Sequence, residues 1–154
     1  MTTCGYSQRI CPSSNSAEIV EILAKHNCVP FAHTNVPQGL LNIEVNNHVW
    51  GHSVNPYKRG FISGGSSGGC AAAVATRCTP FSICSDTAGS ARIPASFCGV
   101  VGFKPTGSKR LSVKGRLGMT MQQVIYSLIL ESSYLWIRHI SRVYNPQCWW
   151  PLMG

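Results

Sequence analysis

The sequence predicts an α/β fold, a mixed sheet with flanking helices, from three observations. An amphipathic helical pattern at 15–26 leads into a short apolar strand pattern at 28–33. A helix of small residues at 70–77 follows a cluster of glycines and serines. Two further apolar strand patterns, 81–84 and 100–103, enclose a tight turn. Helices and strands that alternate in this way form layers in which the helices cover a sheet.

The first element is a helix that we expect to end at His26. Asn15, followed three residues later by Glu18, is a capping-box pattern that favours a helix start. Ile19 and Ile22 fall on one helical face, which indicates that this helix packs by one side.

The next element is a predicted short buried strand over 28–33, where Pro30 suits an edge or a strand start. From 34 to 63 the sequence is rich in Asn, Gly, Pro and His and shows little apolar periodicity. We interpret this stretch as a long loop with at most one turn of helix. Loops of this length in compact domains usually line a site.

The remaining core elements are short and closely spaced. The helix over 70–77 is predicted to end before Thr79 and Pro80, because the residue before a proline is pushed out of the helical region. Strand, tight turn, short helix and second strand then follow at 81–84, 86–92, 94–97 and 100–103.

The last part of the chain, 119–154, is predicted to be a divergent tail that packs poorly or forms an isolated helix. Its best apolar stretch, 124–130, is stopped by Glu131 and is shorter than the roughly twenty apolar residues that a membrane-spanning helix needs. A helix lying on a membrane surface is the alternative, favoured by the basic charge and by Trp136, Trp149 and Trp150.

The net charge of +8 raises the question of an anionic partner. The basic residues are scattered, and their densest group has no interleaved aromatic residues, so we predict no nucleic-acid partner and leave a membrane surface open. No feature of the sequence sets an oligomeric state. The densest group consists of Lys104, Lys109, Arg110, Lys114 and Arg116.

Eight cysteines are many for 154 residues, but none forms a C-x-x-C pair and no secretory leader precedes them. We therefore expect reduced, mostly buried thiols in an intracellular protein, either cytoplasmic or membrane-associated, with no metal and no cofactor. The eight are Cys4, Cys11, Cys28, Cys70, Cys78, Cys84, Cys98 and Cys148.

Two clusters of glycine and serine are the candidates for chemistry. The first, 64–69, would be a flexible linker in isolation, but it opens a helix whose N–H groups converge on Ser66 and Ser67. A phosphate loop does not fit, because the Lys-Ser/Thr ending is missing. The second cluster, 86–94, places Ser90 after a turn of small residues, where successive N–H groups could stabilise an oxyanion. A purely structural turn fits the same spacing equally well.

The run from 64 to 106, with GGSSGG and SDTAGSARIPASFCGVVGFKPT, resembles the amidase signature family. Upstream, VPFAHTNVPQ at 29–38 and GHSVNPYK at 51–58 resemble its fatty acid amide hydrolase branch. On this basis we predict a partial amidase-signature domain over 1–118, followed by the divergent tail over 119–154.

This resemblance implies a mechanism and a set of residues. Ser66, held by a cis peptide bond, would pass a proton from Ser90 to a neutral lysine, while Ser90 attacks an amide carbonyl to form an acyl-enzyme that water hydrolyses. The substrate implied is a small amide, with fatty acid amides as the narrower expectation. The implied oxyanion hole consists of the N–H groups of Thr87, Ala88, Gly89 and Ser90, with Ser67, Asp86 and Arg92 as supporting residues.

Two departures from the family pattern bear on activity. Ala88 stands where the family has a glycine, which would cost about 1 kcal/mol if the turn needs a positive φ there. The family lysine lies upstream of residue 29, and neither Lys25 nor Lys58 matches its motif, so we expect the catalytic lysine to be absent. The alternative function is therefore an inactive truncated isoform or pseudoenzyme that acts as a binding module.

Overall fold

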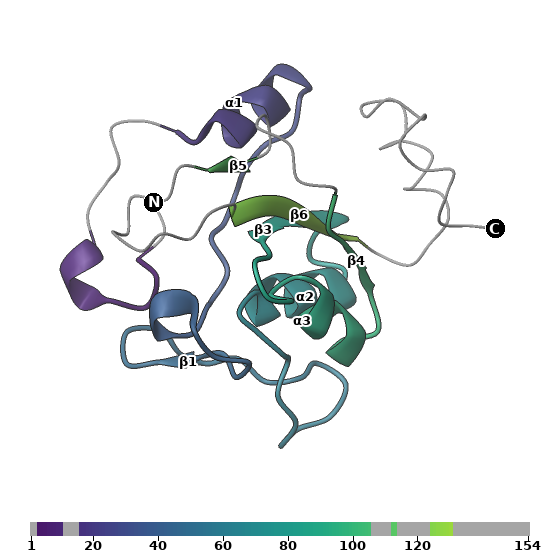
Figure 1. The fold of residues 1–154 in the computed structure, drawn as a ribbon. Helices are drawn as coiled ribbons and strands as arrows, with labels where there is room; N and C mark the ends of the chain where they lie inside the picture. Colours follow the sequence, from purple (N-terminus) through teal and green to yellow (C-terminus); the bar gives the residue numbers. More distant parts are fainter. Residues whose placement is uncertain (1–2, 11–15, 106–111, 114–123, 131–154) are drawn as a thin grey trace.

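The computed structural model describes residues 3–10, 16–105, 112–113 and 124–130. The elements in these segments are short, and helices and strands are mixed along the chain (Figure 1). In chain order they are η1 (Ser7–Arg9), α1 (Glu18–Lys25), η2 (Gln38–Leu40), β1 (Asn46–Asn47), β2 (Gly51–His52), α2 (Gly68–Ala75), β3 (Phe81–Ser85), α3 (Arg92–Phe97), β4 (Val101–Phe103), β5 (Ser112–Val113) and β6 (Val124–Leu130).

The main sheet has the order β3-β6-β4, and β5 also pairs with β6. β6 is antiparallel to both of its long neighbours, with Leu130 opposite Phe81 on β3 and opposite Val101 on β4. β3 and β4 are therefore parallel to each other, and the strand that lies between them comes from much later in the chain. This mixed sheet with helices packed on it confirms the predicted α/β class.

α2 and α3 lie beside each other against this sheet, whereas α1 lies apart from them across the sheet in the view of Figure 1. The buried core between the two helices and the sheet consists mainly of small side chains, which allow the layers to approach closely. At Gly102 on β4, a Cβ atom would lie 2.7 Å from the Cβ of Ala95 on α3. The core residues are Cys70, Ala71, Val74, Cys84, Ala91, Ala95, Cys98 and Ile129.

The N-terminal half corrects two predictions. No strand forms over 28–33, where Val29 and Phe31 are 82% and 70% exposed, because no other described segment pairs with this stretch or covers it. The capping box is also wrong: α1 begins at Glu18 with Ala17 as N-cap and no side-chain cap, and Asn15 lies outside the described residues. Ile19 is buried as expected, but Ile22 is 38% exposed.

The long loop over 34–63 is confirmed, with the single 3₁₀ turn η2. The sequence did not predict the small antiparallel pair β1 and β2, nor the bridge between Val54 and Ile62. Asn47 fixes this loop from within. Its buried side chain donates to Asn35 Oδ1 and Val36 O and accepts from two backbone N–H groups.

The expectation for the tail is wrong over 124–130. This segment is the middle strand of the sheet, and Ile129 on it is fully buried in the core. Trp136, Trp149 and Trp150 lie outside the described residues, and the domain boundary at 118 stays a prediction. No helix in the described segments is both long and apolar enough to span a membrane.

Candidate active site

The Ser66 segment, defined here as residues 64–69, includes the first two residues of α2. The peptide bond between Gly65 and Ser66 is cis, as the resemblance implied. α2 begins at Gly68, two residues before the predicted 70–77 helix, with Ser67 as its N-cap. Ser66 and Ser67 are buried, at 3% and 4% exposure.

Close packing against the long loop 34–63 and α3 fixes this segment. A Cβ at Gly65 would lie 2.5 Å from the backbone oxygen of Asn42, and one at Gly69 would lie 2.5 Å from that of Asn35. A Cβ at Gly64 would lie 2.6 Å from Pro94 Cα on α3. Glycine is needed here because main-chain atoms of the long loop and of α3 occupy the space that a side chain would fill.

The Ser90 turn, defined here as residues 86–91, links β3 to α3. It meets the Ser66 segment through the backbone, because the Ser67 N–H donates to Ser90 O at 3.1 Å. The two predicted serine segments therefore lie side by side, and Ser90 is half-buried. Among the contacts of the described residues there is no hydrogen bond between the Ser66 and Ser90 hydroxyl groups. Their approach within hydrogen-bond distance stays a prediction.

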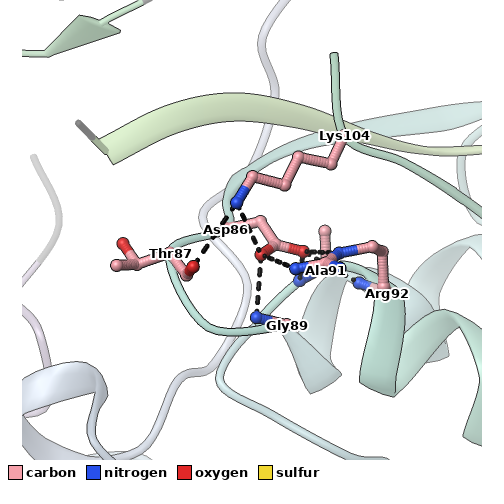
Figure 2. Close-up of polar contacts among 6 residues, drawn as sticks. All are labelled: Asp86, Thr87, Gly89, Ala91, Arg92 and Lys104. Carbon is pink, nitrogen blue, oxygen red and sulfur yellow. Dashed lines mark hydrogen bonds and ion pairs between the residues drawn. The ribbon is translucent and has the colours of Figure 1, made fainter. Parts of the chain in front are cut away.

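Asp86 organises the Ser90 turn (Figure 2). Its fully buried carboxylate accepts from the Gly89 N–H at 2.8 Å, from the Ala91 N–H at 3.1 Å and from the Arg92 N–H at 3.3 Å. The Arg92 guanidinium adds two donors, Nε and Nη2, each 2.9 Å from a carboxylate oxygen. Charge-assisted bonds of this paired form are the strong ones.

These contacts decide the ionisation of Asp86. Burial by itself raises the pKa of this carboxyl group, but the hydrogen bonds from Arg92 and from the N–H groups of Gly89, Ala91 and Arg92 outweigh it. The pKa of Asp86 therefore lies well below its ordinary value, and the group is a carboxylate at neutral pH. The same pairing raises the pKa of Arg92.

A second cation reaches the turn from the residue after β4. Lys104 Nζ lies 3.7 Å from Asp86 Oδ1 and donates to Thr87 O at 3.4 Å (Figure 2). We call the group formed by Asp86, Arg92, Lys104 and the Gly89 and Ala91 N–H groups the carboxylate network. The network places two positive side chains on one buried anion.

The predicted oxyanion hole is only partly compatible with this geometry. The Gly89 N–H points at Asp86, so the prediction that it binds an oxyanion is wrong in this structure. The oxyanion roles of Thr87, Ala88 and Ser90 stay predictions. The strain expected at Ala88 is absent, because Ala88 is not among the described residues with positive φ; Gly89, at φ 116°, adopts that conformation instead.

This site lies inside a region that matches a known family. The family model described as Amidase matches residues 1–128. The chain belongs to the amidase family. The match extends ten residues beyond the predicted boundary at 118 and includes most of β6.

Similar amidases carry several different names. Fatty-acid amide hydrolase 1 of Sus scrofa is 38% identical over 117 residues, which are 76% of this chain and 20% of that protein. Indoleacetamide hydrolase of Pseudomonas syringae pv. syringae is 43% identical over 103 residues, 67% of this chain and 23% of that protein. A solved structure of 6-aminohexanoate cyclic dimer hydrolase with its substrate has 35% identity and a TM-score of 0.70, covering 78% of this chain and 25% of that one. The chain spans about a fifth to a quarter of the length of these relatives.

Sequence reasoning missed Lys104 as a residue of the candidate site. It had assigned Lys104 only to the densest basic group, although the residue also stands in the GFKPT run that resembles the family. The position of Lys104 within this run was the sequence feature that could have identified it. What the sequence could not show is that the side chain returns from β4 to the turn after β3.

Proposed function

We propose that this chain supplies the serine-bearing part of an amidase that hydrolyses carbon–nitrogen amide bonds. Ser90 is the nucleophile and Ser66 the proton relay, with the Thr87, Ala88 and Ser90 N–H groups available to an oxyanion. The observation that carries this proposal is the hydrogen bond from the Ser67 N–H to Ser90 O, which joins the two serine segments next to the start of α2.

The rigidity of the two serine segments supports the assignment of Ser90 as nucleophile and Ser66 as relay. Ser90 sits on a turn whose shape is fixed by the carboxylate network, so an attacking hydroxyl would be held without further rearrangement. The buried Ser66 lies on a backbone packed too closely to move easily. A rigid nucleophile beside a rigid relay is what acyl transfer needs.

The substrate is the narrower part of the proposal. We propose fatty acid amides, because fatty-acid amide hydrolase 1 of Sus scrofa matches 76% of this chain. Comparing hydrolysis of oleamide with that of a short-chain amide tests this class. Equal rates for the two would remove the fatty acid part and leave the amidase proposal in place.

A weak or inactive form of this amidase is the second candidate, favoured by the described lysines. The ammonium group of Lys104 contacts Asp86 and Thr87, Lys58 lies over the Phe61 ring, and Lys25 is exposed at the end of α1. None of these three lysines, the ones in the described part of the chain, bonds to Ser66 or Ser90. The exposed Val29 and Phe31 also suit a binding module.

The deciding experiment treats the full chain with a fluorophosphonate, which bonds through phosphorus to an activated serine oxygen and releases fluoride. Without a general base, Ser90 should label only slowly, through the oxyanion donors that remain, and this labelling should disappear in Ser90→Ala and be no faster in Ser66→Ala. Ser96→Ala, which removes an exposed serine of α3, is the matched control and should label normally. Labelling that persists in Ser90→Ala would overturn the assignment of the nucleophile.

Hydrolysis separates the active enzyme from the second candidate. Without a base, a serine hydroxyl loses the roughly hundredfold to ten-thousandfold that general-base catalysis typically supplies. We therefore expect almost no turnover of an aryl amide by this chain alone, and turnover when an amidase lysine strand is fused ahead of it. Strong Ser90-dependent turnover by the unfused chain would show that another residue serves as base.

A further inference from the structure

Lys104 is placed by rigid neighbours. It follows β4 directly, and β4 packs against α3 through the close approach of Gly102 to Ala95. Its side chain then extends across to the Ser90 turn, with its ammonium group above the Asp86 carboxylate (Figure 2). The side chain is 24% exposed, and its hydrogen bond to Thr87 O lies at the exposed side of the turn.

The peptide groups of the Ser90 turn do not all face the same way. The N–H groups of Gly89, Ala91 and Arg92 point inward to the carboxylate of Asp86. The peptide between Thr87 and Ala88 is reversed, because its carbonyl oxygen points inward to Lys104 Nζ. The Thr87–Ala88 peptide therefore presents its carbonyl oxygen to the carboxylate network, whereas the other three peptides present their N–H groups to it.

Lys104 explains this reversal. A carbonyl oxygen directed towards a buried carboxylate is electrostatically unfavourable, and a cation that contacts both oxygens removes the repulsion. The Lys104 ammonium group has this bridging position, 3.4 Å from Thr87 O and 3.7 Å from Asp86 Oδ1. Without it, rotation of the peptide would turn the Ala88 N–H inward, where the carboxylate would accept it.

The orientation of the Thr87–Ala88 peptide determines the direction in which the Ala88 N–H points. Among the described residues the cis peptide bond is the one between Gly65 and Ser66, so the Thr87–Ala88 peptide is trans. In a planar trans peptide the C=O and N–H bonds point in opposite directions. With the carbonyl directed to Lys104, the Ala88 N–H points away from the carboxylate network, on the exposed rim of the turn.

We propose that Lys104 is a positioning residue of the amidase site, which holds the Thr87–Ala88 peptide so that the Ala88 N–H faces the substrate oxyanion. This inference rests on the proposed function for its catalytic consequence. Lys104 touches neither substrate nor reacting atoms, and it acts through the peptide that it orients. The arrangement of the peptide can be tested without any turnover.

The first test measures backbone amides in the full chain by NMR. If Lys104 holds the peptide, the Ala88 N–H exchanges rapidly with water, while the Gly89 N–H, bonded to Asp86, is protected. In Lys104→Met the Ala88 amide should shift and gain protection as it turns inward. An Ala88 amide that is already as protected as that of Gly89 in the natural chain would overturn the proposal, and this result needs no variant.

The second test measures the rate at which the fluorophosphonate labels Ser90. Loss of one oxyanion donor costs roughly a hundredfold to a thousandfold, and a donor that is only misdirected should cost less, so we expect about a tenfold slower rate in Lys104→Met. Lys104→Arg keeps a charged donor and should recover most of the rate. Lys25→Met, which removes the same charge from the exposed end of α1, should label at the natural rate.

The outcomes separate this inference from the proposed function. If the natural chain shows no Ser90-dependent labelling, the proposed function fails, while the amide exchange still decides whether Lys104 orients the peptide. If labelling is present and Lys104→Met matches the natural rate, or if Lys104→Arg is as slow as Lys104→Met, the positioning role is wrong. A slow Lys104→Met with recovery in Lys104→Arg and an altered Ala88 amide supports it.

Discussion

The Ser66 segment and the Ser90 turn lie side by side, yet different forces hold them. Shape fixes the Ser66 segment, because its glycines leave no room between the backbone and the loops and helix around it. Charge fixes the Ser90 turn, where one buried carboxylate gathers backbone N–H groups and two cations. Added side-chain volume should therefore destabilise the Ser66 segment, whereas changes of charge and pH should destabilise the Ser90 turn.

The largest expected effect is on the charged side. Asp86→Asn keeps the shape of the side chain but removes the anion, leaving the positive charges of Arg92 and Lys104 without their negative partner. Breaking a buried pair from one side costs about 3–5 kcal/mol, and we expect the lower end because the Arg92 side chain is 52% exposed. Urea unfolding measures the loss. Glu44→Gln, which breaks the exposed pair with His52, is the control and should cost less than about 1 kcal/mol.

Acid should weaken the same turn. Because the folded-state pKa of Asp86 lies below its ordinary value, its contribution to stability is complete above about pH 4 and is lost as the pH falls through the lowered pKa. We expect the free energy of unfolding to fall by on the order of 2 kcal/mol from this group on acidification below pH 4. Urea titrations at several pH values should show a shallower fall in Asp86→Asn. An equal fall in the unfolding free energy of the natural chain and of Asp86→Asn would contradict the prediction that the charge of Asp86 stabilises the turn.

Added volume is the corresponding test of the Ser66 segment. In an ordinary helix, replacing glycine by alanine stabilises by about 0.5–1 kcal/mol. At Gly69 on α2 the new Cβ would lie 2.5 Å from Asn35 O and 2.6 Å from Asn35 N, so we expect Gly69→Ala to destabilise by at least about 1 kcal/mol. Urea unfolding of Gly69→Ala shows whether the free energy of unfolding falls, as we expect, or rises. A rise would mean that the loop at Asn35 shifts easily to make room for the added methyl group.

The smallest effect is expected at Ala88, the position where the family has a glycine. Because Ala88 lacks a positive φ, Ala88→Gly relieves no strain and should cost only about 0.4–1 kcal/mol through the entropy of the unfolded chain. Gly89→Ala is the matched partner. Its φ is 116° and its Cβ would meet Ile93 Cδ1 at 2.7 Å, so it should cost clearly more in thermal unfolding. Equal costs would contradict the assignment of the positive-φ position to Gly89.

Local patterns in the sequence predicted the elements around the two serines well. The helix α2, to within two residues at each end, the strand β3 and the turn at Asp86 follow from small residues, apolar runs and turn residues within a few positions. The resemblance added the cis bond before Ser66. These features are local, so the sequence near each one carries the information.

The failures involve contacts that are distant in sequence. The apolar 28–33 looks like a buried strand, but a strand needs a partner, and the described segments offer none. β6 looked like part of a foreign tail, because nothing in its own sequence says that it enters between β3 and β4. Lys104 reaches Thr87 across 17 residues of chain, through a fold that only tertiary packing defines.

The place of β6 in the sheet also affects the order in which the molecule can assemble during synthesis. β3 and β4 emerge from the ribosome first, but each pairs with β6 rather than with the other. Residues 81–103, including the Ser90 turn, must therefore wait until β6, residues 124–130, is available before their sheet can close. Until then both strands expose open edges, which are prone to pair with other chains. A pause that leaves residues 81–103 outside the ribosome while 124–130 are still inside it should thus increase aggregation, whereas a pause after 124–130 have emerged should not.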